Sequence, residues 1–191
     1  MSNRADYIPI IKSDEYKNKS KKMAQDIKNA SKIAPNEATI ESRFDCELFA
    51  FFKEMFEPLG FIYNPIKEKS INTARHISKG RADTAIARLV IEFKQPSTLS
   101  NVHNKSKAIN QISDYLLGLK SEDEEIIEGY VTNGMEGCFV TLVNGEIQEE
   151  DFMELNEFAL DRIIQNILSL KLLAFNASNL VDSFCNPPVN D

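Results

Sequence analysis

Residues 80–96 constrain the fold of this chain more than any other stretch. Their second half alternates with the two-residue period of a β-strand and ends at Pro96. Glu92 and Lys94 lie two positions apart in this strand and are expected to point to the same face. Burying a carboxylate and an ammonium group is costly unless they pair with each other or with an ion. Asp83 is a further acid in this stretch. A site that binds a divalent metal ion and activates water is one explanation for accepting that cost.

The alternative for these three charged residues is structural. Glu-x-Lys is a common pattern on the surface of a strand, and ion pairs that stabilise a fold perturb charged groups much as catalytic sites do. The order of the predicted elements around the three residues favours the catalytic interpretation.

The length and the composition of the chain exclude several classes of protein. A chain of 191 residues with 42% apolar residues suits one domain with a sizeable core plus appendages. No apolar run is long enough to cross a membrane, and the first eleven residues lack the apolar segment of a signal peptide. Three widely separated cysteines indicate a reducing cytoplasm rather than a disulfide framework. Two histidines without a Cys-x-x-Cys motif argue against a zinc site.

The net charge of −7 argues against strong nucleic-acid binding by this chain alone. The charge is unevenly distributed, because residues 12–32 are rich in lysine and residues 121–161 contain neither lysine nor arginine. The lysines suit contact with phosphates, and they equally suit a solvated helix face.

Hydrophobic periodicity predicts the order of the elements. A Lys-rich helix is expected over 14–33, and a strongly apolar helix follows over 37–56. The remaining elements are expected to be strands at 61–63, 81–87 and 88–95, a helix at 103–119, strands at 126–132 and 138–143, and a long helix from about 151. The strand–helix–strand crossover in the middle predicts an α/β fold, in which helices flank a mixed sheet.

This order, with Asp83 on one strand and Glu92-x-Lys94 on the next, resembles the PD-(D/E)XK nuclease superfamily, although Ala82 replaces the usual proline. Gln111 and Tyr115 resemble the Gln-x-x-x-Tyr motif of the RecB-like branch. The resemblance implies a restriction-endonuclease-like mixed β-sheet flanked by helices, an αβββαβ core with an extra C-terminal helix. The family often carries a glutamate on its first helix.

Two residues are candidates for that glutamate. Glu41 is our choice and Glu37 is the alternative, because Glu37 also suits the first turn of a helix for its own sake.

The motifs at 80–96 and 111–115 more narrowly resemble the N-terminal nuclease region of restriction–modification polypeptides, in which a DNA methyltransferase follows the nuclease. Residues 172–184 resemble the connector found there, and no methyltransferase motif is present. The expected domains are a Lys-rich helical appendage at 1–35, a nuclease core at 36–150, a C-terminal helix and connector at 151–184, and a tail at 185–191.

The resemblance implies a metal site. Asp83, Glu92 and the backbone carbonyl of Phe93 would hold Mg²⁺, for which Mn²⁺ is expected to substitute. Glu41 would bind a second ion or position a metal-bound water.

The resemblance also implies roles for the other motif residues. Lys94 would orient or deprotonate the attacking water, the latter requiring a lowered pKa. Gln111 and Tyr115 would hold Lys94 or the phosphate in place, whereas Tyr115 also suits plain core packing.

The expected function is therefore a cytoplasmic, Mg²⁺-dependent DNA endonuclease of the type II or type I restriction class, serving restriction–modification or phage defence. Its expected partners are DNA and a methyltransferase or specificity domain, with a homodimer as one expectation for double-strand cleavage, and no membrane. The alternatives are a catalytically silent nuclease-fold scaffold or DNA-binding module, and a DNA repair or junction nuclease of the same fold.

Overall fold

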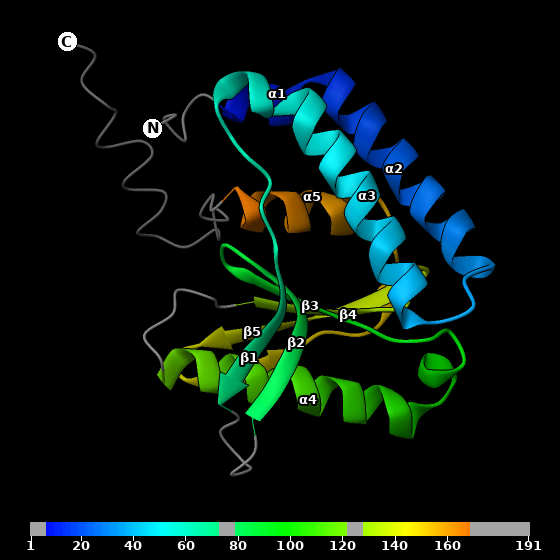
Figure 1. Ribbon diagram of the computed structural model, residues 1–191, viewed down its shortest axis with the longest axis vertical. Coiled ribbons are helices and arrows are strands. Elements are labelled where there is room, and N and C mark those ends of the chain that lie inside the picture. Colours follow the sequence, from blue (N-terminus) through cyan, green and yellow to red (C-terminus); the bar gives the residue numbers. More distant parts are fainter. Residues whose placement is uncertain (1–6, 73–78, 122–127, 169–191) are drawn as a thin grey trace.

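The computed structural model describes residues 7–72, 79–121 and 128–168 (Figure 1). The expected connector at 172–184 and the tail at 185–191 lie outside these residues. The described ranges contain five α-helices, namely α1 (Ile8–Lys12), α2 (Asp14–Lys32), α3 (Glu37–Met55), α4 (Val102–Ser121) and α5 (Glu157–Ile167). The strands are β1 (Ile66–Asn72), β2 (Lys79–Ile86), β3 (Leu89–Phe93), β4 (Glu128–Thr132), β5 (Glu136–Val143), β6 (Glu146–Glu149) and β7 (Met153–Glu154).

The strands form one open sheet in the order β1-β2-β3-β4-β5-β6, and β7 pairs with β5. Among the described strands, only β3 and β4 pair in parallel, and α4 provides the crossover between them. The other pairings are antiparallel. The prediction of an α/β fold with a mixed sheet is confirmed, and most of the sheet is antiparallel.

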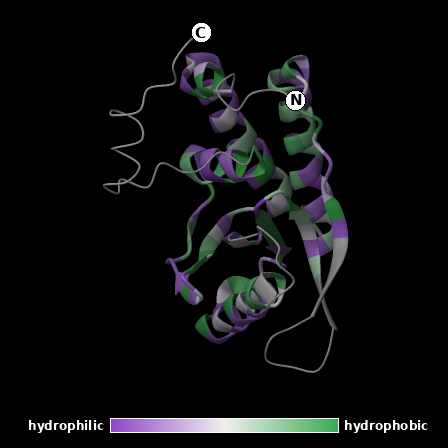
Figure 2. Cartoon of the chain, turned by 90° about the vertical axis from the view of Figure 1, so that its left-hand side faces the viewer, coloured by the Kyte–Doolittle hydropathy of each residue, from purple (hydrophilic) through white to green (hydrophobic). Residues whose placement is uncertain are grey.

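Helices cover both faces of the sheet (Figures 1 and 2). One face packs on α4 through a cluster that includes Val90, Ile112 and Leu116. The other face packs on α2, α3 and α5 through a larger cluster, in which Phe44 of α3 meets Phe93 of β3 with ring centroids 5.5 Å apart. Because Glu92 precedes Phe93 in the strand, the side chain of Glu92 lies on the opposite face, toward α4.

Helix α3 forms where the periodicity predicts it. The side chain of Asn36 accepts a hydrogen bond from the amide of Thr39 and caps the helix N-terminus. The residues buried by this helix recur every three or four positions: Ile40, Phe44, Leu48, Phe51, Phe52 and Met55. The capped end of α3 places Glu37 and Glu41 beside the sheet.

Helix α2 agrees with the predicted range, but it is more than a loosely attached segment. Tyr16, Met23 and Ile27 are buried in the same hydrophobic cluster as α3. The Tyr16 hydroxyl donates a hydrogen bond of 2.6 Å to Asp161 of α5. These contacts join α2 to the core, although a helical appendage was expected here.

Two predicted elements are wrong. Residues 61–63 are not a strand, and the polar segment that follows forms β1 instead, because pairing with β2 decides its conformation rather than an apolar pattern. The C-terminal helix begins at Glu157 rather than near Asp151. Asn156 caps it, and residues 153–154 pair with β5 as β7.

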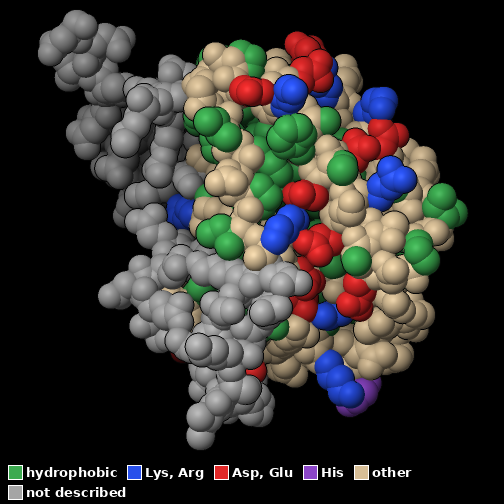
Figure 3. All heavy atoms as spheres, in the orientation of Figure 1, with side chains coloured by type: hydrophobic (Ala, Val, Ile, Leu, Met, Phe, Trp, Pro, Cys, Tyr) green, Lys and Arg blue, Asp and Glu red, His purple; other side chains and the backbone are tan. Residues whose placement is uncertain are grey.

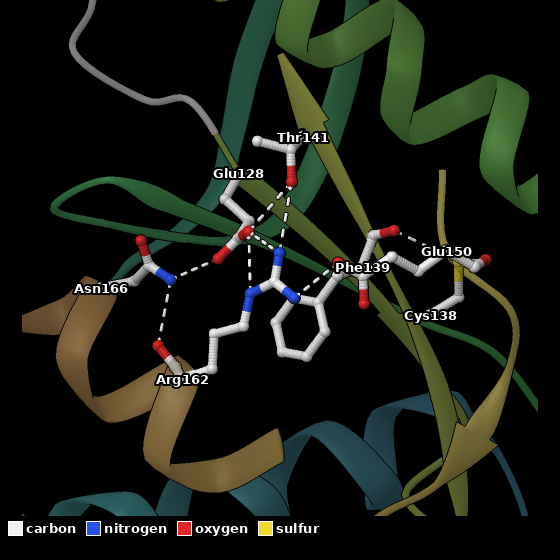
Figure 4. A network of polar contacts seen from close by, with 7 residues as sticks. All are labelled: Glu128, Cys138, Phe139, Thr141, Glu150, Arg162 and Asn166. Atoms are coloured by element: carbon white, nitrogen blue, oxygen red, sulfur yellow. Dashed lines mark hydrogen bonds and ion pairs between the residues drawn. The ribbon is translucent and has the colours of Figure 1, made fainter. Parts of the chain in front are cut away.

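A buried ion-pair network fastens α5 to the sheet (Figure 4). Glu128 of β4 is only 2% exposed and accepts hydrogen bonds from Arg162 and Asn166 of α5 and from Thr141 of β5. The guanidinium carbon of Arg162 also lies 4.1 Å from the centroid of the Phe139 ring. Both oxygens of the buried carboxylate are satisfied, as the burial of a charge requires.

Within the residues that the structure describes, none of the helices combines the length and the apolar character needed to cross a lipid bilayer.

Candidate functional site

The candidate site lies where β2 and β3 separate. The register between these strands pairs Thr84 with Ile91 and is not continued at Asp83. Instead, Oδ2 of Asp83 accepts a hydrogen bond of 2.8 Å from the backbone amide of Phe93. A side-chain carboxylate thus replaces a backbone acceptor at the end of the ladder, which fixes Asp83 beside the strand that carries Glu92.

Glu92, Lys94, Gln111 and Tyr115 form a continuous chain of contacts between β3 and α4. Nζ of Lys94 lies 2.6 Å from Oε1 of Glu92. Nε2 of Gln111 donates to the same Oε1 at 2.5 Å and to the Tyr115 hydroxyl at 2.7 Å. Gln111 and Tyr115 therefore share one face of α4, and Gln111 meets the carboxylate rather than Lys94.

The second oxygen of Glu92 is the unusual feature of this chain of contacts. Glu92 is 2% exposed, and its Oε2 is buried without a hydrogen-bond partner in the part of the chain that the structure describes. A buried carboxylate oxygen without a donor is costly, so such an atom calls for an explanation. A bound cation is one such explanation, and it suits a site that contains a second acid.

Glu37 and Glu41 of α3 both border the site, in different ways. Oε1 of Glu37 accepts a hydrogen bond of 3.1 Å from the backbone amide of Gln95, immediately after Lys94. Oε1 of Glu41 lies 3.3 Å from the Thr84 hydroxyl, next to Asp83 in the strand. The two candidates for the helix glutamate are therefore both near the other acids, and Glu41 is the one on the side of β2.

The sequence interpretation missed the partner of Glu41. Nζ of Lys67 in β1 lies 3.1 Å from Oε1 of Glu41 and 3.3 Å from Oδ1 of Asp45. Asp45 also accepts a hydrogen bond of 2.8 Å from the Tyr63 hydroxyl. The position of Asp45, one helical turn after Glu41, was a visible signal, whereas Lys67 lies in the segment whose strand was not predicted.

Burial and mutual repulsion change the acidity of the two strand carboxylates. Burial, together with the charge of Asp83, raises the pKa of Glu92 to about 7, although Lys94 acts in the opposite direction. Burial also raises the pKa of Asp83, assisted by Glu41 and Glu37 and opposed by the Phe93 amide and Lys94. Two acids that resist ionisation side by side attract a cation.

The pKa of Lys94 moves in the direction opposite to the one needed for a general base. Burial alone would lower it, but Glu92, Glu37 and Asp83 outweigh burial and raise the pKa. Lys94 in this state is an ammonium group that donates hydrogen bonds. The expectation that its pKa falls enough to deprotonate water is therefore wrong for this arrangement.

The candidate ligands meet part of the coordination requirement of a hard divalent cation. Asp83 and Glu92 supply carboxylate oxygens, and the unpartnered Oε2 of Glu92 is available for coordination. Over the described ranges, no three His, Cys, Asp or Glu side chains are arranged as a metal-binding cluster. Two side chains would thus need a backbone oxygen and water to complete a coordination sphere, and that role for the Phe93 carbonyl stays a prediction.

The face of the molecule seen in Figure 3 mixes both signs of charge. Asp and Glu side chains lie next to Lys and Arg side chains there, without a continuous basic band. A cavity of about 400 Å³ lies elsewhere, between α5 and the β5–β7 region, and none of its lining residues belongs to the candidate site.

No protein-family model, no curated protein and no solved structure matches this chain.

Proposed function

We propose that this chain is a Mg²⁺-dependent DNA endonuclease domain, the cleavage module of a restriction–modification or phage-defence system. One observation carries the proposal. Asp83, Glu92 and Lys94 converge at the end of two strands, Gln111 holds one oxygen of Glu92, and the other oxygen is buried without a partner. Paired acids beside a lysine are the groups that phosphodiester hydrolysis with a metal ion needs.

The order of elements supports the finer fold assignment. Helix α3 is followed by β1, β2 and β3, then by α4 and β4, which is the αβββαβ order of a restriction-endonuclease-like core. Helix α5 would be the extra C-terminal helix. Asp83 on β2 and Glu92 on β3 occupy the strands that the resemblance assigns to them.

Asp83 and Glu92 would hold the metal ion, because their oxygens are the hard ligands that Mg²⁺ prefers. When bound, Mg²⁺ supplies a more acidic water and neutralises negative charge at the scissile phosphate. A metal ion bound to Oε2 of Glu92 would give this oxygen a partner and would offset part of the free-energy cost of burying the carboxylate.

The remaining residues bind and orient. Lys94 carries an ammonium group at the site and would donate to an oxygen of the phosphate as negative charge develops there. Gln111 would keep Glu92 in one rotamer through its hydrogen bond to Oε1, and Tyr115 would hold the Gln111 amide from behind.

Cleavage of supercoiled plasmid in Mg²⁺ and in Mn²⁺ tests the proposal. We expect nicking by the wild type that is lost with EDTA and reduced at least 100-fold in Lys94→Ala. Lys105→Ala is the matched control, because it also removes a lysine paired with a glutamate, but its partner is Glu136 of β5 rather than an acid of the candidate site. Equal nicking by the wild type and Lys94→Ala would refute the assignment of the site.

The catalytically silent scaffold is the second candidate, and one observation favours it. Lys94 pairs with Glu92, and Lys67 pairs with Glu41, so ion pairs alone already satisfy much of the acidic cluster. A scaffold would neither cut DNA nor bind Mn²⁺. A wild type that binds Mn²⁺ through Asp83 and Glu92 and nicks plasmid would exclude this candidate.

A further inference from the structure

We propose that Lys67 is a resident cation of the candidate site, whose ammonium group occupies a second cation position so that only one divalent ion binds. The inference rests on the proposed function, since it concerns how many metal ions that function uses. Lys67 is here a positioning residue that acts through Glu41, and it does not act on the substrate.

Three oxygens converge on the Lys67 ammonium. Nζ lies 3.1 Å from Oε1 of Glu41, 3.3 Å from Oδ1 of Asp45 and 2.9 Å from the Thr84 hydroxyl. Two carboxylates and a hydroxyl are also the kind of hard oxygen ligands that a divalent cation takes. A tethered ammonium therefore fills a position that would otherwise suit a second metal ion.

This position is built by two elements rather than by one flexible side chain. Lys67 of β1 pairs directly with Thr84 of β2 in the antiparallel register, so its stem starts beside the hydroxyl that its ammonium contacts. Glu41 and Asp45 are one turn apart on α3 and face the same point. The Tyr63 hydroxyl holds Asp45 from the other side at 2.8 Å. A competing ion would have to displace a cation that the strand itself holds in place.

The net charge of the described cluster also favours the binding of a single divalent ion. When ionised, its five carboxylates belong to Glu37, Glu41, Asp45, Asp83 and Glu92. Against them stand the two ammonium groups of Lys67 and Lys94. The cluster thus carries an excess of three negative charges, which one divalent ion reduces to one and two divalent ions would reverse in sign. Without Lys67 the excess is four, and two divalent ions balance it.

Counting bound Mn²⁺ on the full chain tests this inference, by calorimetry and by the EPR signal of free Mn²⁺. We expect one Mn²⁺ per chain in the wild type and two in Lys67→Ala. Lys22→Ala is the matched control, because it removes an exposed lysine paired with Asp26 on α2, and we expect it to bind one. Lys67→Met keeps the aliphatic stem and serves if Lys67→Ala does not fold.

A double variant identifies the second position. Adding Asp45→Asn to Lys67→Ala removes one of its carboxylates, and we expect the count to return to one. A count that remains at two would place the extra ion elsewhere and overturn the inference.

The outcomes separate this inference from the proposed function. Two ions in the wild type, or one ion in both the wild type and Lys67→Ala, would overturn the role of Lys67 and leave the nuclease proposal standing. No ion in the wild type and one in Lys67→Ala would support Lys67 as the resident cation and count against the nuclease proposal. No ion in either protein would overturn both.

Discussion

At the scale of single residues, the burial of Glu92 couples the stability of the protein to pH. Its pKa in the folded protein is about 7, above the ordinary value of 4.5. The folded state therefore binds this proton more tightly than the unfolded state does. The contribution of Glu92 to the free energy of unfolding is therefore constant below about pH 4.5 and falls as the pH rises from about 4.5 through 7.

We expect this loss to be on the order of 1–3 kcal/mol between pH 5 and pH 8 in EDTA. Glu92→Gln, which carries no titrating group, should flatten the pH dependence and melt higher than the wild type at pH 8. Thermal unfolding across this range checks the prediction. Parallel curves for the wild type and Glu92→Gln would contradict it.

Gln111 provides a second test at this scale, because its amide donates both to Glu92 and to the Tyr115 hydroxyl. Gln111→Ala should release Glu92 and lower plasmid cleavage by roughly 10–100-fold, since small misplacements of a reacting group are expensive. Tyr115→Phe removes the hydroxyl that accepts from Gln111 but leaves the hydrogen bond between Gln111 and Glu92, and it should cost less. Single-turnover cleavage rates measure both, and the reverse order of the two losses would contradict the arrangement.

At the scale of elements, the close approach of α4 to β4 keeps Gln111 over Glu92. A Cβ at Gly129 of β4 would lie 2.6 Å from Cδ1 of Ile112, the residue after Gln111. Gly129→Ala should therefore move α4, destabilise the protein by roughly 1–3 kcal/mol and reduce cleavage. Denaturant unfolding and cleavage rates check this, and adding Ile112→Ala should relieve the overlap. Unchanged cleavage in Gly129→Ala would show that the site does not depend on this contact.

The network around Glu128 predicts how α5 is attached. Arg162→Leu would leave a carboxylate that is 2% exposed without its charged partner and should destabilise the protein by about 3–5 kcal/mol. Replacing both partners, as Glu128→Gln with Arg162→Leu, should cost less than the single change. Denaturant unfolding of the two proteins measures the difference. A double variant less stable than Arg162→Leu would contradict this account of the network.

How far the sequence predicts the elements depends on where their conformations are decided. Helix α3 has a strong apolar period, and the alternation around Glu92 marks β3, so local pattern suffices for both. Strand β1 carries mostly polar residues and exists because β2 offers it a partner. Strand β7 has two residues and likewise depends on its pairing with β5, which shifted the expected start of α5.

The residues of the site likewise divide into those that the sequence indicates and those that only the fold brings together. The acids, Lys94, Gln111 and Tyr115 were expected from the resemblance to the nuclease superfamily. The structure brings Glu92, Lys94, Gln111 and Tyr115 into one chain of contacts. Lys67 meets Glu41 only through the pairing of β1 with β2, which no local pattern indicates. The sequence also does not predict the direction in which the pKa of Lys94 shifts, because that direction depends on how many acids surround the ammonium group.

At the scale of the whole molecule, the net charge of −7 works against contact with the phosphate backbone. We expect the isolated chain to bind duplex DNA with a dissociation constant of roughly 1 μM or weaker, even at low salt. Sequence-specific affinity would then reside in a methyltransferase or specificity domain of the same system, which we propose as a partner. A gel-shift titration at low salt that gave nanomolar, sequence-specific binding would contradict this division.

Cutting both strands of a duplex requires two such sites, so a homodimer, formed with DNA or before it, is part of the same proposal. Several lysines of α2 already have acidic partners, such as Lys19 with Glu54 and Lys28 with Glu154. These pairings agree with weak DNA binding by the chain alone.

The most direct test of the site is the location of a bound metal ion. Crystals grown with Mn²⁺ would reveal the ion by anomalous scattering at the manganese edge. The account predicts one peak per chain, in contact with Asp83 and with Oε2 of Glu92, and none beside Lys67. A peak at Lys67 or elsewhere with none at Asp83 and Glu92, or no peak at a Mn²⁺ concentration that supports cleavage, would contradict it.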